Sequence, residues 1–153
     1  TDNLLPEEFI DWGHSEAYVQ AIGGGECAGV VIDLVATLLL ESEEKIVLAA
    51  QSLQENRWAD SIYHCYSGSI NAAKALLLGE GIETNSQLSI IQIFDEHFTK
   101  EKLSLEDSFS KMIYQINQNQ PTEDFAQSYF IQNEKFIQLA KQLHKKEAHA
   151  TVR

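Results

Sequence analysis

The sequence predicts an all-α protein: an antiparallel up-and-down bundle of four to five helices that follows a partly irregular N-terminal segment. Three observations favour this architecture. From Glu41 onward, apolar residues recur at three- and four-residue spacing, which is the period of an amphipathic helix. Residues that cap or break helices separate these stretches. The links between them are short, as they are in helix bundles.

The first forty residues differ in character from the rest. Pro6, Gly13 and the run Gly23 to Gly25 stand among short apolar pieces without a sustained period, which predicts loop and short helix. The numbering also opens at Thr1 rather than at a methionine. We therefore expect residues 1–40 to be a linker or the tail of a preceding domain packing on the bundle. The helical domain is then expected over 41–146, and a disordered tail over 147–153.

The first two helices are expected on either side of residue 56. Residues 30–50 continue from an apolar run into a charged stretch and are expected to be helical, although 30–40 alone is apolar enough for a buried strand. Asn56 is a candidate N-cap for the second helix, and Gly79 and Gly81 end it.

Three more helices complete the predicted bundle. Ser86 can cap the third, and Ser104 with Asp107 has the spacing of a capping box before the fourth. Pro121 and Thr122 open the last helix. Its apolar face is formed by Phe125, Tyr129, Phe136, Ala140 and Leu143.

The charge of the chain is unevenly distributed. The formal net charge is -12, and residues 1–44 hold ten acidic residues and no Lys or Arg. Nucleic-acid binding relies on Lys and Arg that neutralise phosphates, so a nucleic-acid partner is not expected. The basic residues near the end are best explained as the solvated face of a final helix; they are Lys135, Lys141, Lys145 and Lys146.

Cysteines and histidines predict no metal site in this chain. Cys27 and Cys65 form no C-x-x-C pair, and His144 and His149 miss the four-residue spacing of helical ligands. Cys65 is expected to be a small core residue. The apolar run 30–40 is too short to span a bilayer, and no secretory signal is visible. These features predict a cytoplasmic protein without a membrane partner.

Residues 23–28 (GGGECA) match the dinucleotide-binding pattern G-x-G-x-x-A. However, Glu26 would lie within the anion site, and no clear strand precedes the pattern. A flexible turn that leads into a helix explains these glycines better.

The second helix, DSIYHCYSGSINAAKALL, carries an ordered polar stripe as well as an apolar face. The stripe consists of Asp60, His64, Ser67, Asn71 and Lys74, spaced four, three, four and three apart. Asp60 lies one turn before His64 and could orient the imidazole and hold it protonated. The stripe fits either a free surface or a polar seam that is buried or faces a second subunit.

The same helix resembles that of the HEPN family. Its AAKALL run, the following Gly-Ile and the later FDEHF occur in the family's order, over residues 41–144. The resemblance implies a helical bundle of four or five helices that is frequently a dimer through this helix, and association with nucleotides or RNA. In many members an R-x4-6-H motif gives metal-independent ribonuclease activity.

The ribonuclease motif does not carry over onto this sequence. In the alignment on AAKALL, the family's Arg falls on His64 and its His falls on Asn71, so both active groups are replaced. Arg57 and His64 satisfy R-x6-H, but seven residues too early. The resemblance therefore implies a non-catalytic module for dimerisation or small-ligand binding through the polar stripe. A toxin-like ribonuclease that uses His64 and a nucleotide-binding regulator are the alternatives.

Residues 11–19 (DWGHSEAYV) and 23–34 (GGGECAGVVIDL) resemble linker and tail sequence of bacterial sirohaem-type nitrite or sulfite reductases that carry a HEPN-like appendage. This resemblance implies that the chain is the C-terminal part of such an oxidoreductase. The cysteines of the iron-sulfur cluster are absent here, so sirohaem and the cluster would belong to a preceding domain. The expected partners are then a second copy or the parent reductase domain, with a nucleotide or small anion as candidate ligand.

Overall fold

The computed structural model of the chain describes residues 24–98, 103 and 105–152, with side chains described for 31–98, 103 and 105–147. These residues form five α-helices and one short 3-10 helix, and they contain no strand. The all-α prediction is confirmed. The elements are α2 (Gly24–Gln54), α3 (Trp58–Gly79), α4 (Gln87–His97), α5 (Phe109–Tyr114), η1 (Gln115–Gln118) and α6 (Glu123–Val152).

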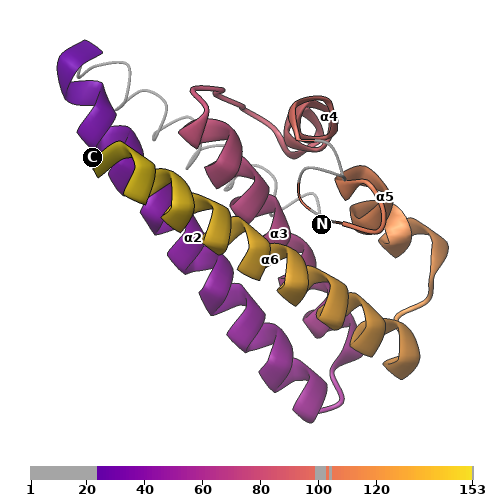
Figure 1. Cartoon of the computed structure of the whole chain (residues 1–153). Coiled ribbons are helices and arrows are strands. Elements are labelled where there is room, and N and C mark those ends of the chain that lie inside the picture. The colour runs from indigo at the N-terminus through magenta and orange to yellow at the C-terminus, as the bar shows by residue number, and fades with distance from the viewer. Residues whose placement is uncertain (1–23, 99–102, 104, 153) are drawn as a thin grey trace.

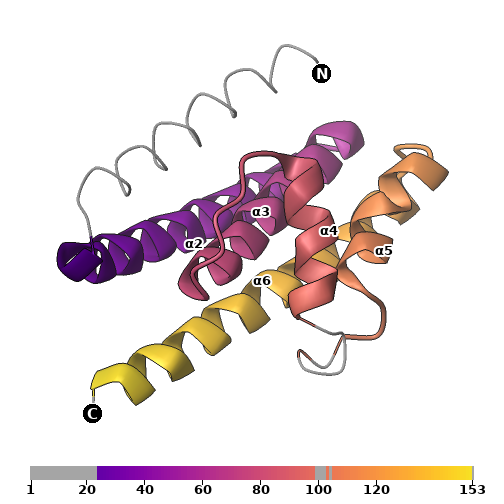
Figure 2. The same cartoon turned by 90° about the horizontal axis from the view of Figure 1, so that it is seen from above.

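Three long helices, α2, α3 and α6, lie side by side, as Figures 1 and 2 show. The chain reverses between α2 and α3, so these two helices are antiparallel. The shorter helices α4 and α5 lie between α3 and α6 in the sequence, and α4 crosses the long helices instead of running along them (Figures 1 and 2). As a result, α6 runs in the same direction as α3 and antiparallel to α2.

The central helix is α3, which packs against α2, α4 and α6. Between Ser67 and Leu77 every residue is buried except Asn71, which is half-buried. Gly68 lies where three helices meet: a Cβ atom there would lie 3.1 Å from Ile137 Cδ1 on α6 and 3.2 Å from Lys45 Cβ on α2. The absence of a side chain at Gly68 therefore allows α2 and α6 to approach α3 closely.

Aromatic side chains hold the short helices against α6. The ring of Phe94 on α4 lies 4.7 Å from that of Phe109 on α5 and 5.5 Å from that of Phe136 on α6, measured between centroids. Phe109 and Phe136 lie 4.8 Å apart. Such tilted and edge-to-face contacts add to the burial of large apolar surfaces, so this cluster links α4 and α5 to α6.

Two of the predicted helix starts are confirmed. The Ser86 side chain accepts a hydrogen bond from the backbone N–H of Ser89 at the start of α4. The hydroxyl of Thr122 accepts one from the N–H of Phe125 at the start of α6. Both are the side-chain caps that the residue types favour.

Two other helix starts differ from the prediction. Asn56 does not cap α3, because it adopts a left-handed conformation with φ of 61°, and Arg57 occupies the N-cap position. At α5 the cap is Ser108, whose hydroxyl accepts from the N–H of Lys111. Asp107 forms an ion pair with Lys111 instead, and Ser104 lies outside the described residues.

The predicted domain limits also differ from the helix limits. Helix α2 begins at Gly24, so the boundary expected between residues 40 and 41 falls inside it, and 30–40 is helix rather than strand. The glycines 24 and 25 belong to this helix and not to a phosphate loop. Helix α6 reaches Val152, where a disordered tail was expected from 147. No helix in the described ranges is long and apolar enough to cross a membrane.

Candidate functional site

The five residues of the predicted polar stripe all lie on α3, but their surroundings change along the helix. Asp60 is exposed at the start of α3, and His64 and Asn71 are half-buried. Ser67 and Lys74 are buried, with 8% and 5% of their surface exposed. The stripe therefore runs from the protein surface into the packed interior, and only part of it is accessible to a ligand or a partner.

Asp60 is held by the residue that precedes α3. The Asp60 carboxylate accepts a 2.8 Å hydrogen bond from Nη1 of Arg57, and Arg57 also forms an ion pair of 2.7 Å with Glu55. All three side chains are half or more exposed. These two carboxylates neutralise the guanidinium, which lies at the exposed edge of the stripe.

His64 differs from the expectation of a protonated imidazole. Burial lowers its pKa because it disfavours the imidazolium, and the nearby positive charge of Lys45 lowers the pKa further. The negative charge of Asp60 acts in the opposite direction, but it is a smaller cause than either. His64 is therefore neutral at neutral pH. Its Nδ1 is buried and has no hydrogen-bond partner among the described residues.

His64 and Asn71 lie on the same face of α3. Seven residues are close to two full turns, so the two side chains are separated by about 10 Å along the helix and by little rotation around it. Both are half-buried. A surface that covered this face could contact the two side chains together.

Lys45 brings a second helix into the site, and sequence reasoning did not single it out. Lys45 lies on α2 and is close enough to His64 to shift its pKa. Leu48, one turn further along α2, is 41% exposed. The feature of the sequence that could have pointed to Lys45 is its position as the first Lys or Arg of the chain. The α2–α3 face, as we call the surface formed by Lys45, Leu48, His64 and Asn71, combines polar and apolar groups.

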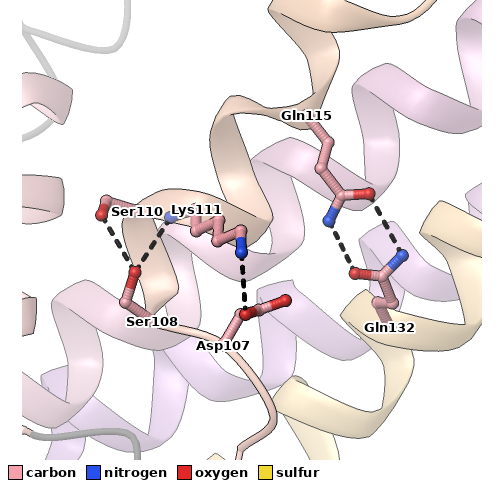
Figure 3. A network of polar contacts seen from close by, with 6 residues as sticks. All are labelled: Asp107, Ser108, Ser110, Lys111, Gln115 and Gln132. Atoms are coloured by element: carbon pink, nitrogen blue, oxygen red, sulfur yellow. Dashed lines mark hydrogen bonds and ion pairs between the residues drawn. The ribbon is translucent and has the colours of Figure 1, made fainter.

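The remaining polar contacts are structural. On another face of α3, the buried Ser69 hydroxyl donates to the side-chain oxygen of Asn133 on α6, and Asn133 donates to the carbonyl of Tyr129. Next to Asn133 in the sequence, Gln132 on α6 faces Gln115 on η1, and their side-chain amides donate to each other at 2.7 and 3.3 Å (Figure 3). These contacts join α3, η1 and α6.

Neither a thiol nor a metal cluster is available in the described part of the chain. Cys65 is fully buried, as expected for a core residue, and burial raises the pKa of its thiol to about 12. A thiol with this pKa is a poor nucleophile at neutral pH. Within the residues searched, no group of three His, Cys, Asp or Glu side chains could hold a metal ion.

A comparison with known families identifies the fold. The family model of the HEPN domain matches residues 35–145, which is most of the chain. The match begins in α2, and it includes α3 with the whole polar stripe and most of α6. No curated protein matches the chain. The match supports the resemblance to the HEPN family and does not test the resemblance to the reductases. On this match, the chain belongs to the HEPN domain family.

Proposed function

We propose that this HEPN domain is a non-catalytic module that associates with a second copy of itself through the α2–α3 face. The observation that carries the proposal is the half-burial of His64 and Asn71 on one face of α3. The buried Nδ1 of His64 lacks a partner among the described residues, and a buried polar atom without a partner costs free energy. A facing subunit could supply that partner only if the His64 ring turned toward it, since the atom is inaccessible in the monomer. The exposed Leu48 adds apolar area at the edge of the face.

The residue types argue against RNA cleavage at this face. Metal-independent cleavage needs a proton acceptor for the 2'-hydroxyl and a cation at the scissile phosphate. Asn71 is an amide and cannot accept that proton. The Arg57 guanidinium, the cation of the bare R-x6-H pattern, is already paired with Glu55 and Asp60. These two observations support a non-catalytic role.

Sedimentation equilibrium tests the association. We expect a concentration-dependent dimer whose dissociation constant rises at least tenfold in Leu48→Asp and Asn71→Asp, because each places a charge in the interface. The matched control is Ile131→Asp, which adds the same charge at a 64% exposed aliphatic residue on α6 and should leave the dimer unchanged. A wild-type protein that is monomeric at every concentration contradicts the proposal.

A ribonuclease is the second candidate, and one observation favours it. His64 is neutral at neutral pH and can accept a proton, and Lys45 provides a positive charge nearby. Incubation of single-stranded RNA with wild type, His64→Ala and Lys45→Ala separates the two functions. Cleavage that is lost in His64→Ala would overturn the non-catalytic proposal.

Nucleotide or small-anion binding is tested by calorimetry with ATP and NAD. The buried Lys74 can reach a ligand only if the residues that cover it move, whereas Lys45 is half-buried on the accessible face. A saturable heat that disappears in Lys45→Ala would therefore support a nucleotide-binding regulator and place the nucleotide on the α2–α3 face.

We further infer from the resemblance of residues 11–19 and 23–34 that the domain is attached to a sirohaem nitrite or sulfite reductase. Sirohaem and the iron-sulfur cluster would be bound by that reductase, because the only cysteine in the described side chains is the buried Cys65. The reading frame upstream of Thr1 tests this attachment directly. A frame without a reductase upstream contradicts it.

A further inference from the structure

Helix α2 exposes a stripe of apolar side chains along one side of the helix. Ile32, Leu40 and Val47 are 52%, 58% and 54% exposed, and Ala36 between them is exposed as well. Their spacing of four, four and seven places them on one side of the helix. The buried positions of α2 lie on another side; they are Val35, Leu39, Ser42, Ile46 and Ala49. We call Ile32, Ala36, Leu40 and Val47 the α2 outer stripe.

The α2 outer stripe is long enough to hold a chain segment. Fifteen residues separate Ile32 from Val47, which corresponds to about 22 Å of helix. Three acidic residues lie on or beside it. Glu43 forms a 2.6 Å ion pair with Lys141 on α6, and Asp33 and Glu44 are exposed. Single exposed apolar residues are ordinary on protein surfaces, but an aligned series of them marks a surface that binds something apolar.

The chain itself contains a suitable occupant. Residues 1–23 directly precede Gly24, the first residue of α2, and hold no Lys or Arg. They contain eight large apolar residues, namely Leu4, Leu5, Phe9, Ile10, Trp12, Tyr18, Val19 and Ile22. Even a fully helical segment of this length spans about 34 Å, which is the distance from Gly24 to Val47 along α2. Gly23 directly precedes the helix, and a glycine there permits the backbone conformations that a chain reversal requires.

We propose that residues 1–23 fold back and dock on the α2 outer stripe of the same molecule. A covalently attached segment competes at a high effective concentration, which favours it over a second copy or a separate protein. Lys45 of the α2–α3 face lies two residues before Val47 and hence on a nearly opposite side of α2. Leu48 of the same face directly follows Val47, but the docking and the association proposed above use different residues of α2, and either can fail alone.

Charge predicts how the docking responds to salt. Residues 1–23 carry five acidic residues, and Asp33 and Glu44 are exposed on α2. The apolar contact therefore forms against like charge, which salt screens. Docking should tighten as ionic strength rises, whereas contacts between opposite charges would weaken.

Trp12 is the probe for the experiment, because the chain has two tryptophans and the other, Trp58, can be replaced. In a Trp58→Phe background we expect a blue-shifted Trp12 emission that acrylamide quenches several times less than in the same background with Leu40→Asp and Val47→Asp. The protection should not depend on protein concentration. The matched control is Ile131→Asp, at an exposed position on α6, which should leave Trp12 protected.

Two results would overturn the proposal. Equal quenching of Trp12 with and without the α2 substitutions means that the segment does not dock on the stripe. Protection that is lost on dilution means that the occupant is a second copy. A second measurement remains available if the charged variants unfold. It uses a variant with Trp12→Cys, Leu40→Cys and Cys27→Ser, and a short bifunctional reagent cross-links the two introduced cysteines. Absence of an intramolecular cross-link would likewise overturn the proposal.

Discussion

The hydroxyl of Ser69 on α3 donates a 2.5 Å hydrogen bond to the side-chain oxygen of Asn133 on α6, and both side chains are completely buried. Asn133 in turn donates to the backbone carbonyl of Tyr129 one turn earlier. Two parallel helices are thus joined by a polar contact in the packed interior. Such a contact is costly to break from one side only.

Removal of the Ser69 hydroxyl should therefore destabilise the domain. Ser69→Ala leaves the Asn133 oxygen buried without its donor, so we expect the free energy of unfolding to fall by about 1–3 kcal/mol. Urea denaturation measures this, with Ser128→Ala on the exposed side of α6 as control, expected within about 0.5 kcal/mol. If Ser69→Ala with Asn133→Leu loses as much as the two single changes together, the contact does not couple the helices.

The two helical glycines of α3 should respond oppositely to alanine. Gly68→Ala places a Cβ atom 3.1 Å from Ile137 Cδ1 and 3.2 Å from the Ser42 carbonyl, so these neighbours must give way by a few tenths of an ångström. We expect a loss of about 1–3 kcal/mol. At Gly79 the nearest atom, Val35 Cγ2, is 4.0 Å away, and Gly79→Ala should be neutral or stabilising by up to about 1 kcal/mol. Thermal unfolding of both variants checks this, and equal melting temperatures would contradict it.

The start of helix α5 is held by a residue from another helix as well as by its own N-cap, Ser108. One oxygen of Asp95 on α4 accepts a 2.9 Å hydrogen bond from the N–H of Phe109, and the other accepts from Ser110 at 3.2 Å. Asp95→Ala should cost about 0.5–2 kcal/mol in urea denaturation, since both amides lose their partner. Asp107→Ala removes only an exposed ion pair with Lys111 and should cost less than about 1 kcal/mol. The reverse order of the two effects would exclude this capping role.

The lowered pKa of His64 predicts that the folded protein loses stability in mild acid. Its folded-state pKa is lowered below the ordinary 6.5, so protonation is harder in the folded than in the unfolded protein. Its contribution to stability is present above pH 6.5 and is lost as the pH falls through the folded-state pKa. A proton NMR titration should give a midpoint below 6.5, and His64→Gln should flatten the pH dependence of unfolding in this range. A midpoint above 6.5 would reverse the sign.

The Cys65 thiol should be unreactive while the protein is folded. Burial raises its pKa to about 12, so the thiolate is scarce and the reagent has no access. In a Cys27→Ser variant, labelling at pH 8 should follow the rate of unfolding and become fast in denaturant. The raised pKa also stabilises the fold at neutral pH, and this contribution is lost as the pH rises toward 12. Fast labelling of the native variant would contradict the burial.

Local patterns in the sequence were sufficient to predict most of the helices. Ser86 and Thr122 are caps whose partners lie three residues away, and such short-range contacts can be recognised without a structure. The amphipathic period likewise placed the polar stripe of α3 on one helix. Asn56 was predicted wrongly because Asn suits both an N-cap and a left-handed turn, and its φ of 61° shows the second.

Contacts between residues that are distant in the sequence could not be predicted from local patterns. A helical period assigns a residue to a face, but it does not say which helix covers that face or how deeply. For this reason Lys74 was grouped with Asp60, although one is buried and the other exposed. The same limit hid the cap that Asp95 provides to α5 and the approach of Lys45 to His64. Sixty-four residues separate Ser69 from Asn133, and no local pattern connects them.

The position of α6 has a consequence for folding during synthesis. Phe136 and Ile137 fill the core beside α3, and Lys141 reaches back to Glu43 near the middle of α2. Until α6 has left the ribosome, the nascent α2–α3 hairpin therefore exposes the buried face that includes Cys65 and Ser69. The domain consequently closes late in translation, and a ribosome that stalls before α6 holds an open, aggregation-prone hairpin.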